Sequence, residues 1–328
     1  MSVKVFGISM VRNEVDIIRV NVQHHLSLGL DCLLIVDNGS SDGTDRELQR
    51  LSRDERVRWH RNDSPFHQSE ITTGLAREAF RSGADWVVPM DADEFWWAPR
   101  RNFKEVLALS TAGAIRVAIV NFIQRRGQER ASPEALLHMT RRVAQPIGPV
   151  ERCSELVESR QISIVEMMYP LKWISRASET IEIAAGNHEV SGVEGSYEDT
   201  DEIICLHAPL RLRATLEGKA DMARRQEEAG WPDGAGWQAT RWRRLQNEAG
   251  LDEEWAANSY AGDWIDVWEA RHQVIFDPTL RDVVAPWIWR PLWKRISSLW
   301  CSSVFFRGWW RQGRLTRDGQ LGRVGFAG

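Results

Sequence analysis

The sequence predicts an α/β protein built around a doubly wound, mostly parallel β-sheet. Three observations support this class. Short apolar runs alternate with segments of helical spacing over the N-terminal third of the chain. The apolar runs suit strands that are buried on both faces. Polar residues follow several of these runs directly, as expected where the strands of an open α/β sheet meet their ligands.

The first two predicted strands flank one helix. Residues 3–10 form the first strand, and residues 16–28 carry apolar side chains at helical spacing before Gly29, a natural helix stop. Residues 32–36 form the second strand, which ends in the polar loop 37–44. The polar residues that follow the first strand are Arg12, Asn13 and Glu14.

Two more strands complete the N-terminal pattern. Thr44 and Glu47 match a capping box, which predicts that a helix begins there. Residues 57–60 predict a short third strand, residues 70–81 a helix, and residues 86–90 a fourth strand. The resulting β-α-β-α-β-α-β order is typical of a parallel, doubly wound sheet.

The rest of the chain is less regular. Residues 123–180 show little periodicity, and the composition shifts to Trp-rich helical segments from residue 231, with breaks at Pro278 and Pro286. The further predicted elements are strands at 114–122, 180–185 and 202–206 and a helix at 214–229.

Composition restricts the classes of function. The 328 residues, 43% of them hydrophobic and 27% charged, describe an ordinary soluble globular protein. The net charge of −4 gives no general reason to expect nucleic-acid binding. The four cysteines form no C-x-x-C pair, which argues against a thiolate metal site and favours a reducing compartment. Because we find neither a signal-peptide core nor an apolar run of roughly 18 residues, we expect a cytoplasmic location.

The strongest candidate site follows the fourth predicted strand. Asp91, Asp93 and Glu94 lie between that apolar run and Phe95. Like charges held this close repel one another unless a cation joins them. Carboxylate oxygens favour Mg²⁺ or Mn²⁺, which keep part of their coordination shell for substrate phosphates. The sequence therefore predicts a metal and diphosphate site, and a solvated acidic turn is the alternative.

The loop 37–44 is a second candidate site. An Asn-Gly hairpin turn at Asn38 and Gly39 is one interpretation, but the residues that follow are helical in character, whereas a hairpin needs a second strand. In the other interpretation, Asp37 accepts hydrogen bonds from a ribose or base, and Gly39 and Gly43 let the backbone approach that ligand closely.

Three motifs in this order and spacing resemble the family-two glycosyltransferases of GT-A fold, in the branch with a D-A-D-E-F motif. They are residues 9–14, 37–44 and 86–96. The resemblance covers residues 1–125 and extends loosely to about residue 225. It implies a GT-A domain at 1–230, with a nucleotide-sugar half at 1–125 and an acceptor half at 126–230, and a helical, Trp/Arg-rich extension at 231–328.

The resemblance implies a hexosyltransferase-type enzyme. It would move a sugar from a UDP-, GDP- or dTDP-linked donor to the hydroxyl of a glycan or lipid-linked acceptor, with inversion, in surface polysaccharide or glycolipid synthesis. Asp91, Asp93 and His207 would hold Mn²⁺ or Mg²⁺, although Ala208 replaces the aromatic residue common after that histidine. The nucleotide-sugar pocket would be formed by Arg12, Asn13, Glu14, Asp37, Asn38, Gly39, Asp91 and Lys219.

The catalytic base is left open. An inverting transfer needs a carboxylate or histidine within hydrogen-bond reach of the acceptor hydroxyl. The Glu-Asp pair typical of the family has no clear match here, with Glu198 and Asp199 as a formal alternative. The candidates are Glu94, His188 and Glu189.

The segment 286–317 combines tryptophans with arginines and one lysine, Lys294, and contains no acidic residue. It has two interpretations. It is either a helix that packs its aromatic stripe on the catalytic domain, or an amphipathic segment in an anionic membrane surface. The second interpretation makes the protein peripheral on the inner membrane face. Nothing else in the sequence supports nucleic-acid contact.

Two rival classes of function remain. One is a non-catalytic protein that keeps the fold to bind a nucleotide or glycan. The other is a metal-dependent phosphohydrolase, whose haloacid type places a D-x-D motif after the first strand with its first Asp as nucleophile. Here the first strand ends in residues 12–14 instead, which argues against that type.

Overall fold

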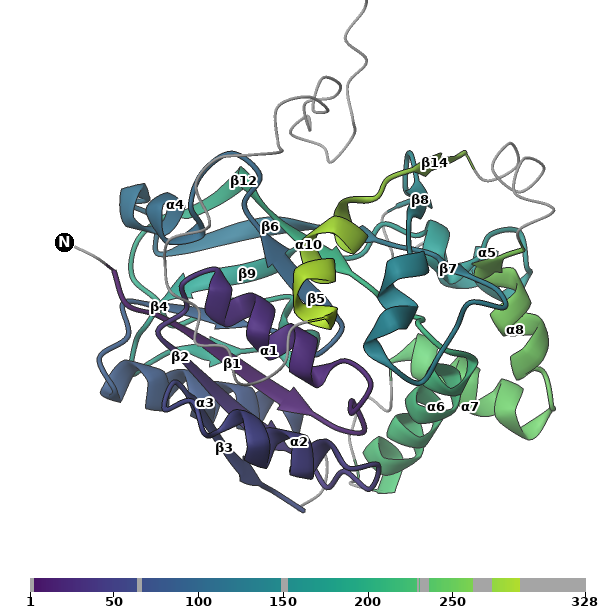
Figure 1. The fold of residues 1–328 in the computed structure, drawn as a ribbon, viewed down its shortest axis with the longest axis horizontal. Helices are drawn as coiled ribbons and strands as arrows, with labels where there is room; N and C mark the ends of the chain where they lie inside the picture. Colours follow the sequence, from purple (N-terminus) through teal and green to yellow (C-terminus); the bar gives the residue numbers. More distant parts are fainter. Residues whose placement is uncertain are drawn as a thin grey trace, which may run out of the picture. The chain divides into compact units, whose positions relative to one another are not determined.

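A computed structural model describes residues 3–63, 67–148, 153–228, 230, 236–261 and 273–289. Residues up to Ile288 form one compact unit around an eight-stranded sheet (Figure 1). The strand order is β3-β2-β1-β4-β9-β6-β12-β5. The strands are β1 Val5–Val11, β2 Cys32–Asp37, β3 Val57–Arg61, β4 Trp86–Pro89, β5 Glu94–Trp97, β6 Ala114–Asn121, β9 Lys172–Arg176 and β12 Tyr197–His207.

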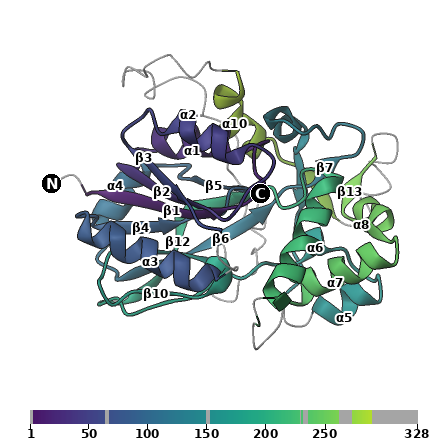
Figure 2. The same ribbon diagram turned by 90° about the horizontal axis from the view of Figure 1, so that it is seen from below.

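The first four strands form the parallel half of the sheet. Strand β1 pairs in parallel with β2 and β4, and β2 pairs in parallel with β3. Three helices connect these strands, and Figure 2 shows α1 and α2 on one face and α3 on the other. They are α1 Ile18–Ser27, α2 Thr44–Leu51 and α3 Gln68–Arg81. The predicted order and doubly wound arrangement are therefore confirmed.

The period of two along a strand explains why both faces of β2 are covered. Leu33 and Ile35 pack into the core under α1 and α2, which includes Leu48 of α2. Leu34 and Val36, like their neighbour Cys32, pack into the opposite core, which includes Leu75, Ala76 and Ala79 of α3. An uninterrupted apolar run is what such a doubly covered strand requires.

The second half of the sheet is mixed. Strand β9 runs antiparallel to β4 and β6, and β12 pairs in parallel with β6 and antiparallel with β5. Strands β4 and β5 stand four places apart in the order although only residues 90–93 connect them. This connection spans at most about 18 Å, whereas four strand spacings in a flat sheet measure about 19 Å. The sheet must therefore curl, and the acidic motif lies in the connection that closes the curl.

The predicted helix start at Thr44 is confirmed, but its capping box is wrong. The cap residue of α2 is Gly43, with a φ of 105° and no capping side chain. The hydroxyl of Thr44 donates to Oδ1 of Asp42 and accepts from the backbone N–H of Glu14 at 2.8 Å. It is therefore used to join the loop after β2 to the loop after β1.

The C-terminal part of the described chain is mainly helical, as predicted. Helix α6 matches the predicted helix at 214–229, whereas β10 is shorter and β12 longer than predicted. Pro278 precedes α10, but Pro286 lies inside α10 and does not end it, contrary to the prediction. The remaining helices are α4 Phe103–Leu109, α5 Cys153–Glu158, α6 Arg213–Glu228, α7 Trp237–Asn247, α8 Leu251–Ala257 and α10 Thr279–Ile288.

Several short elements complete the unit. The 3₁₀ helices are η1 Pro133–His138, η3 Ile164–Glu166 and η4 Ala185–Asn187, and the short strands are β7 Gln124–Arg125, β8 Arg141–Val143, β10 Glu182–Ile183, β11 Val190–Ser191, β13 Ser259–Tyr260 and β14 Val274–Phe276. Helices α6, α7 and α8 share a second core around Trp242, Leu245 and Trp255. No described helix has the length and apolar character that crossing a membrane requires.

Two predictions about the C-terminal region stay predictions. Residues 290–328, which hold most of the Trp/Arg segment, lie outside the described residues, so both interpretations of that segment stay predictions. The predicted domain division at residue 230 also stays a prediction. The described residues 236–288 pack in the same compact unit as the sheet.

Candidate functional site

Three loops meet at the carboxyl ends of β1, β2 and β4. The backbone N–H of Asn13 donates to Oγ of Ser40 at 2.9 Å, which joins the first loop to the second. The side-chain amide of Asn21, on α1, donates to the carbonyls of Ala92 and Glu94 at 3.0 and 2.8 Å. The three motifs singled out in the sequence are therefore brought together, because parallel strands end at one edge of a sheet.

The loop after β2 is held in a special backbone conformation. Gly39 has a φ of 71°, and a Cβ at this position would lie 3.1 Å from Oδ1 of Asp63 and 3.3 Å from Nη1 of Arg12. Asn13 also has a positive φ, of 54°, and its Oδ1 accepts from the backbone N–H of Ser41. Glycine and asparagine tolerate this left-handed region best. The loop geometry thus explains why these residue types stand here.

Asp37 is fully buried at the end of β2. Its Oδ1 accepts from the backbone N–H of Ser40 at 3.1 Å, and its Oδ2 lies 3.2 Å from Nη1 of Arg61. Each carboxylate oxygen can accept a second hydrogen bond. Asp37 therefore orders the loop, and its predicted contact with a nucleotide stays a prediction.

Strand pairing explains how His207 reaches the acidic motif. His207 ends β12, and its cross-strand partners are Glu94 on β5 and Asn121 on β6. The backbone N–H of Ala208 donates to the carbonyl of Asp93 at 2.9 Å. Because β5 pairs antiparallel with β12, Glu94 and Asp93 lie beside His207.

One buried cation, Lys172 at the start of β9, organises half of the acidic motif. Its Nζ lies 2.9 Å from Oδ2 of Asp91, 2.8 Å from Oε1 of Glu94 and 2.7 Å from the carbonyl of Gly186. These acceptors match the three donors of an ammonium group. Asn187 donates to the other oxygen of Asp91 at 3.2 Å. We call Asp91, Glu94, Lys172 and Asn187 the Lys172 cluster.

The pKa values of this cluster reflect burial and ion pairing. Burial alone would lower the pKa of Lys172, but Asp91 and Glu94 raise that pKa above its ordinary value. Burial raises the pKa of Glu94 to about 7, against the opposing effect of Lys172. The cluster therefore keeps its ammonium group charged, while Glu94 titrates near neutral pH.

A second buried cation, Arg211, joins the first loop to the acidic motif. Its guanidinium lies 2.6 Å from Oε2 of Glu14 and 3.0 Å from Oδ2 of Asp16, and its Nη1 lies 3.8 Å from Oδ2 of Asp93. Nη1 of Arg211 is buried and has no hydrogen-bond partner among the described residues. Nζ of Lys219 lies 3.9 Å from the same oxygen of Asp93. We call these five residues, with His207, the Arg211 cluster.

Charge effects in the Arg211 cluster oppose burial. Burial would raise the pKa of the Asp93 carboxyl, but His207, Lys219 and Arg211 hold it well below its usual range. Burial raises the pKa of Glu14 to about 7, and Arg211 opposes that increase. Asp93 therefore stays ionised at physiological pH, whereas Glu14 gains a proton near neutral pH.

His207 and Asp93 face each other with two acceptor atoms. Nδ1 of His207 lies 2.7 Å from Oδ1 of Asn121, so a neutral imidazole places its proton on Nδ1. The lone pair of Nε2 then faces Oδ1 of Asp93 at 3.6 Å. In this tautomer the two acceptors repel each other, and either a proton on Nε2 or a cation between Nε2 and Oδ1 would remove that repulsion. The pair therefore fits part of a cation site.

The described residues contain no group of three His, Cys, Asp or Glu side chains that could hold a metal ion by themselves. Mg²⁺ is commonly bound through one or two carboxylates, with substrate phosphates and water completing its shell. Asp93 and His207 fit that pattern. Asp91 is engaged by Lys172 and Asn187 instead, so its role as a metal ligand stays a prediction.

The three candidates for a catalytic base have different surroundings. Glu94 is bound by Lys172. Burial, followed by the charge of Lys172, lowers the pKa of His188 to about 4, and its Nδ1 lies 3.3 Å from the carbonyl of Leu171. Glu189 is exposed. The structure brings the first two candidates toward Lys172 and leaves the third at the surface.

Two arginines contact the loop 37–44, Arg12 from the loop after β1 and Arg225 from α6. Arg12 donates through Nη1 to the carbonyls of Asn38 and Gly39, both at 2.9 Å, and lies 3.5 Å from Asp221 of α6. Arg225, one turn further along α6, donates to the same carbonyl of Asn38 at 3.3 Å. Arg12 and Asn38 thus lie in the predicted pocket region, but through backbone contacts that the sequence did not indicate.

Sequence reasoning missed several members of the two clusters. Lys172 begins a strand in a region without periodicity, and Arg211 lies four residues after His207, in the segment between β12 and α6. For Lys172 and Arg211, the sequence shows only a charged residue next to apolar ones. This pattern does not indicate which carboxylates each of them binds. The residues missed were Asp16, Asn121, Lys172, Asn187 and Arg211.

A comparison of the sequence with models of protein families and with curated proteins finds no match. Among solved structures, residues 1–349 of TarS from S. aureus in complex with UDP-GlcNAc match with a TM-score of 0.37 and 11% identity, over 68% of this chain and 66% of that chain. The same protein in complex with UDP gives a TM-score of 0.39 at 11% identity, over 68% of this chain and 65% of that chain.

The 4-diphosphocytidyl-2C-methyl-D-erythritol synthase from Anaerococcus prevotii matches with a TM-score of 0.26 and 13% identity, over 38% of this chain and 59% of that chain. This chain thus spans just under two thirds of the TarS structures and less of the synthase. These likenesses are remote. The α/β, Rossmann-like fold class rests on the strand order and pairing described above.

Proposed function

We propose that the protein is a glycosyltransferase of the hexosyltransferase type, which uses a nucleotide sugar and a divalent cation. The observation that carries this proposal is the bridge formed by Arg211. It connects Glu14 and Asp16, after β1, with Asp93, after β4. The loops that would hold a nucleotide and the carboxylate that would hold a cation are thereby parts of one site.

The position of the site supports nucleotide binding. Ligands of open α/β sheets bind beyond the carboxyl ends of the strands. The loop 37–44 lies there and exposes backbone through Gly39 and Gly43, both with positive φ. A UDP-, GDP- or dTDP-linked sugar would lie across this loop, with its diphosphate toward Asp93 and Lys219.

The charge balance supports a bound cation. The two clusters hold the carboxyl groups of Glu14, Asp16, Asp91, Asp93 and Glu94 against the cations Lys172, Arg211 and Lys219, and the excess of negative charge grows above pH 7, where Glu14 and Glu94 lose their protons. A diphosphate entering such a site is repelled unless a cation accompanies it. Asp93 and His207 would hold Mn²⁺ or Mg²⁺, which would offset the negative charge of a departing nucleotide diphosphate.

The chemistry is a single displacement at the sugar. The acceptor hydroxyl oxygen forms a bond to the anomeric carbon while the bond from that carbon to the diphosphate oxygen breaks, which inverts the anomeric configuration. The hydroxyl proton passes to a base. Glu94 and His188 lie beside Lys172 and are the nearest candidates for that role, whereas Glu189 would act only if the acceptor reached the surface there.

The acceptor would be a glycan or a lipid-linked glycan in surface polysaccharide or glycolipid synthesis. The Trp/Arg composition of residues 286–317 supports contact with a membrane that carries such an acceptor. The protein would then act at the cytoplasmic face of the membrane.

A panel of nucleotide sugars with Mn²⁺ tests the proposal, with thermal stability and release of nucleotide diphosphate as readouts. We expect one base class to raise the melting temperature and to be turned over. Binding without turnover under any acceptor condition would favour the non-catalytic alternative. Release of phosphate from simple esters, lost in Asp91→Asn and without sugar transfer, would favour the phosphohydrolase.

A further inference from the structure

Helix α1 bonds the backbone of the connection between β4 and β5. The side-chain amide of Asn21 donates to the carbonyls of Ala92 and Glu94 at 3.0 and 2.8 Å. The carbonyl of Asp91 lies 3.4 Å from the same nitrogen. Asn21 is only 2% exposed, and an amide nitrogen carries two hydrogens. The donors of this buried side chain are therefore fully used by the connection.

Two neutral histidines on α1 complete the network. The backbone N–H of Trp96 donates to Nε2 of His25 at 3.3 Å, so a neutral ring carries its proton on Nδ1. That Nδ1 lies 3.2 Å from Oδ1 of Asn21, which turns the NH₂ group of Asn21 toward the connection. Nε2 of His24 lies 2.7 Å from the carbonyl of Trp96. Burial lowers the pKa of His24 to about 4 and that of His25 well below its ordinary value, which keeps both rings neutral.

This network covers an edge of the sheet. Strand β5 is last in the strand order, next to β12. An edge strand leaves the N–H and C=O groups of every second residue without a partner strand. In β5, the carbonyl of Glu94 and both backbone groups of Trp96 bond side chains of α1. Polar side chains of α1 thus take the place of a further strand.

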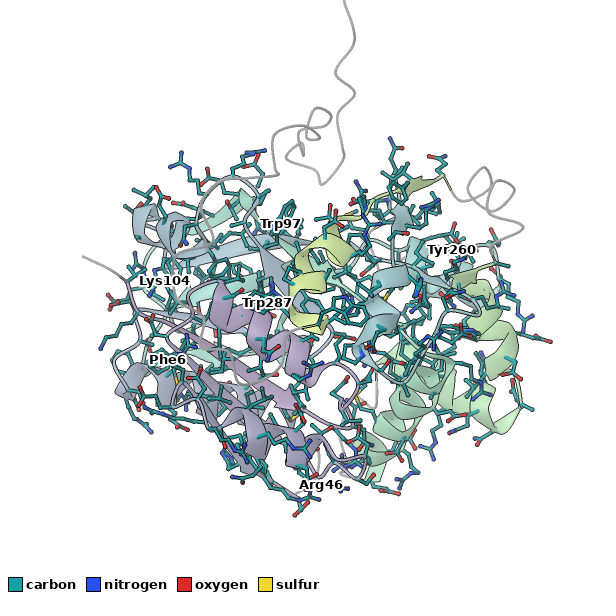
Figure 3. All side chains as sticks on the ribbon, viewed as in Figure 1. Phe6, Arg46, Trp97, Lys104, Tyr260 and Trp287 are labelled. Atoms are coloured by element: carbon teal, nitrogen blue, oxygen red, sulfur yellow. The ribbon has the colours of Figure 1, made fainter. Side chains whose placement is uncertain are left out.

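Packing holds α1 in place on its apolar sides. Val20 and Val22 are buried in the core between the helix and the sheet. Trp97 of β5 and Trp287 of α10, both labelled in Figure 3, pack against the same core. The helix that carries Asn21 is therefore supported by residues of the sheet and of α10.

The first turn of α1 is connected to the Arg211 cluster. The backbone N–H of Ile18 donates to the carbonyl of Glu14 at 2.8 Å, and Oε2 of Glu14 lies 2.6 Å from the guanidinium of Arg211. One helix is thus bonded to the loop after β1 through its first turn and to the acidic motif through Asn21. A nucleotide at the loop and a cation at the motif would share this support.

Every carbonyl of residues 91–94 has a hydrogen-bond donor. Asn21 supplies donors to three of them, and the backbone N–H of Ala208 donates to the fourth, that of Asp93, at 2.9 Å. Because each peptide unit is planar, fixed carbonyls leave few values for the backbone dihedral angles. The direction in which the Asp93 side chain extends toward His207 is therefore set by these bonds.

We propose that Asn21 is a positioning residue for the acidic motif. Its amide holds the backbone of residues 91–94 in the conformation that makes Asp93 face His207. The hold on the backbone follows from the contacts alone, whereas its consequence for binding of a cation and a nucleotide diphosphate rests on the proposed function.

Three variants separate positioning from general stability. Asn21→Leu removes the amide and nearly preserves the side-chain volume. Val22→Ala is the matched control, because Val22 is also buried on α1 but packs in the apolar core. Both changes should lower the melting temperature, the first by leaving carbonyls unbonded and the second by leaving a cavity. Asn21→Ser keeps one hydroxyl donor and decides the question if Asn21→Leu does not fold.

The first experiment measures hydrogen exchange of the full chain without ligand, by mass spectrometry. We expect the backbone amides of residues 91–97 to exchange about tenfold faster in Asn21→Leu than in wild type, with a smaller increase in Asn21→Ser. Val22→Ala should exchange like wild type in this segment. Unchanged exchange in the folded Asn21 variants, or an equal increase in Val22→Ala, would overturn the proposal.

The second experiment measures nucleotide affinity with and without Mn²⁺ by isothermal titration calorimetry. Asn21→Leu should lose about tenfold of the gain in affinity that Mn²⁺ provides and keep its affinity without Mn²⁺, whereas Val22→Ala should keep both. A full Mn²⁺ gain in the Asn21 variants would show that Asn21 only stabilises the fold, and would overturn the proposal. If wild type itself shows no nucleotide binding while the Asn21 variants exchange faster at 91–97, the proposed function fails and the hold of Asn21 on the motif stands.

Discussion

Two buried cations divide an acidic motif that is continuous in the sequence. Lys172 binds Asp91 and Glu94 at hydrogen-bond distance, and its ammonium donors are fully used. Arg211 binds Glu14 and Asp16 but stands 3.8 Å from Asp93, with one buried nitrogen lacking a hydrogen bond among the described residues. The first cluster is closed and the second is open. A closed cluster stabilises the fold, whereas an open one can receive a ligand.

Removing the cation of the closed cluster should produce the largest loss of stability. Lys172→Met leaves Asp91 and Glu94 without their counter-charge beside a buried strand, and breaking such a pair typically costs about 3–5 kcal/mol. We expect the free energy of unfolding, measured by chemical denaturation at pH 8, to fall by that amount.

A second variant serves as the control for this prediction. Lys172→Met combined with Glu94→Gln removes one of the stranded charges, so the double variant should recover part of the lost stability. If Lys172→Met alone unfolded no more easily than wild type, the closed cluster would not be a stabilising element.

Acid should weaken the contact between α1 and β5, and the expected loss of unfolding free energy is similar to that for Lys172→Met. His24 and His25 on α1 bond the backbone of Trp96 on β5, and burial lowers the pKa of His24 to about 4 from 6.5. Below pH 6.5 His24 is protonated in the unfolded chain but stays neutral in the folded chain. The free energy of unfolding therefore decreases as the pH falls toward 4. The shift corresponds to about 3 kcal/mol at most.

The difference between His24→Gln and wild type isolates this effect, because the other titrating groups cancel. Glutamine keeps a donor for the carbonyl of Trp96 and does not titrate. The stability difference between the two proteins, followed by denaturation from pH 7.5 to pH 4.5, should change in favour of the variant as the pH falls. A difference that is constant with pH would show that His24 is not buried in its neutral form.

The parallel half of the sheet, with the loops after β1, β2 and β4, could largely be predicted from the sequence. The strands β1, β2 and β4 are apolar because both of their faces are covered, so the pattern is strong, and parallel pairing places their polar ends at one edge. The loops at Asn13, Asp37 and Asp91 were found for that reason. In this part of the chain, the local sequence pattern and the position of each segment in the fold agree.

The second half could not be predicted in the same way. Strand β9 is short and inserts antiparallel between β4 and β6, which no local pattern signals, and it is this strand that delivers Lys172. Arg211 reaches the site because β12 ends beside β5. Both contacts join residues far apart in the chain, and a single charge in the sequence does not specify its partner.

A conservative change in the open cluster should have a smaller effect on stability than Lys172→Met. Arg211→Lys keeps the charge but loses the fork that spans Glu14 and Asp16, so we expect a loss of about 2 kcal/mol in unfolding free energy. Nucleotide affinity, measured by isothermal titration calorimetry, should fall about tenfold, since the orientation of Asp93 and Glu14 depends on that fork.

Arg213→Lys is the matched control, because Arg213 forms exposed ion pairs with Glu217 and Asp252 on the same stretch of chain. It should change stability by less than about 1 kcal/mol and leave nucleotide affinity unchanged. If the two arginine variants behaved alike, the Arg211 bridge would not be what unites the loops.

The most direct test of the central claim is the Mn²⁺ dependence of nucleotide binding. UDP, GDP and dTDP are titrated into wild type, Asp93→Asn and Asp201→Asn, an exposed control, with and without Mn²⁺. We expect that one nucleotide binds, that Mn²⁺ strengthens binding at least about tenfold, and that only Asp93→Asn abolishes this gain. The absence of nucleotide binding, or a Mn²⁺ gain that survives in Asp93→Asn, would contradict it.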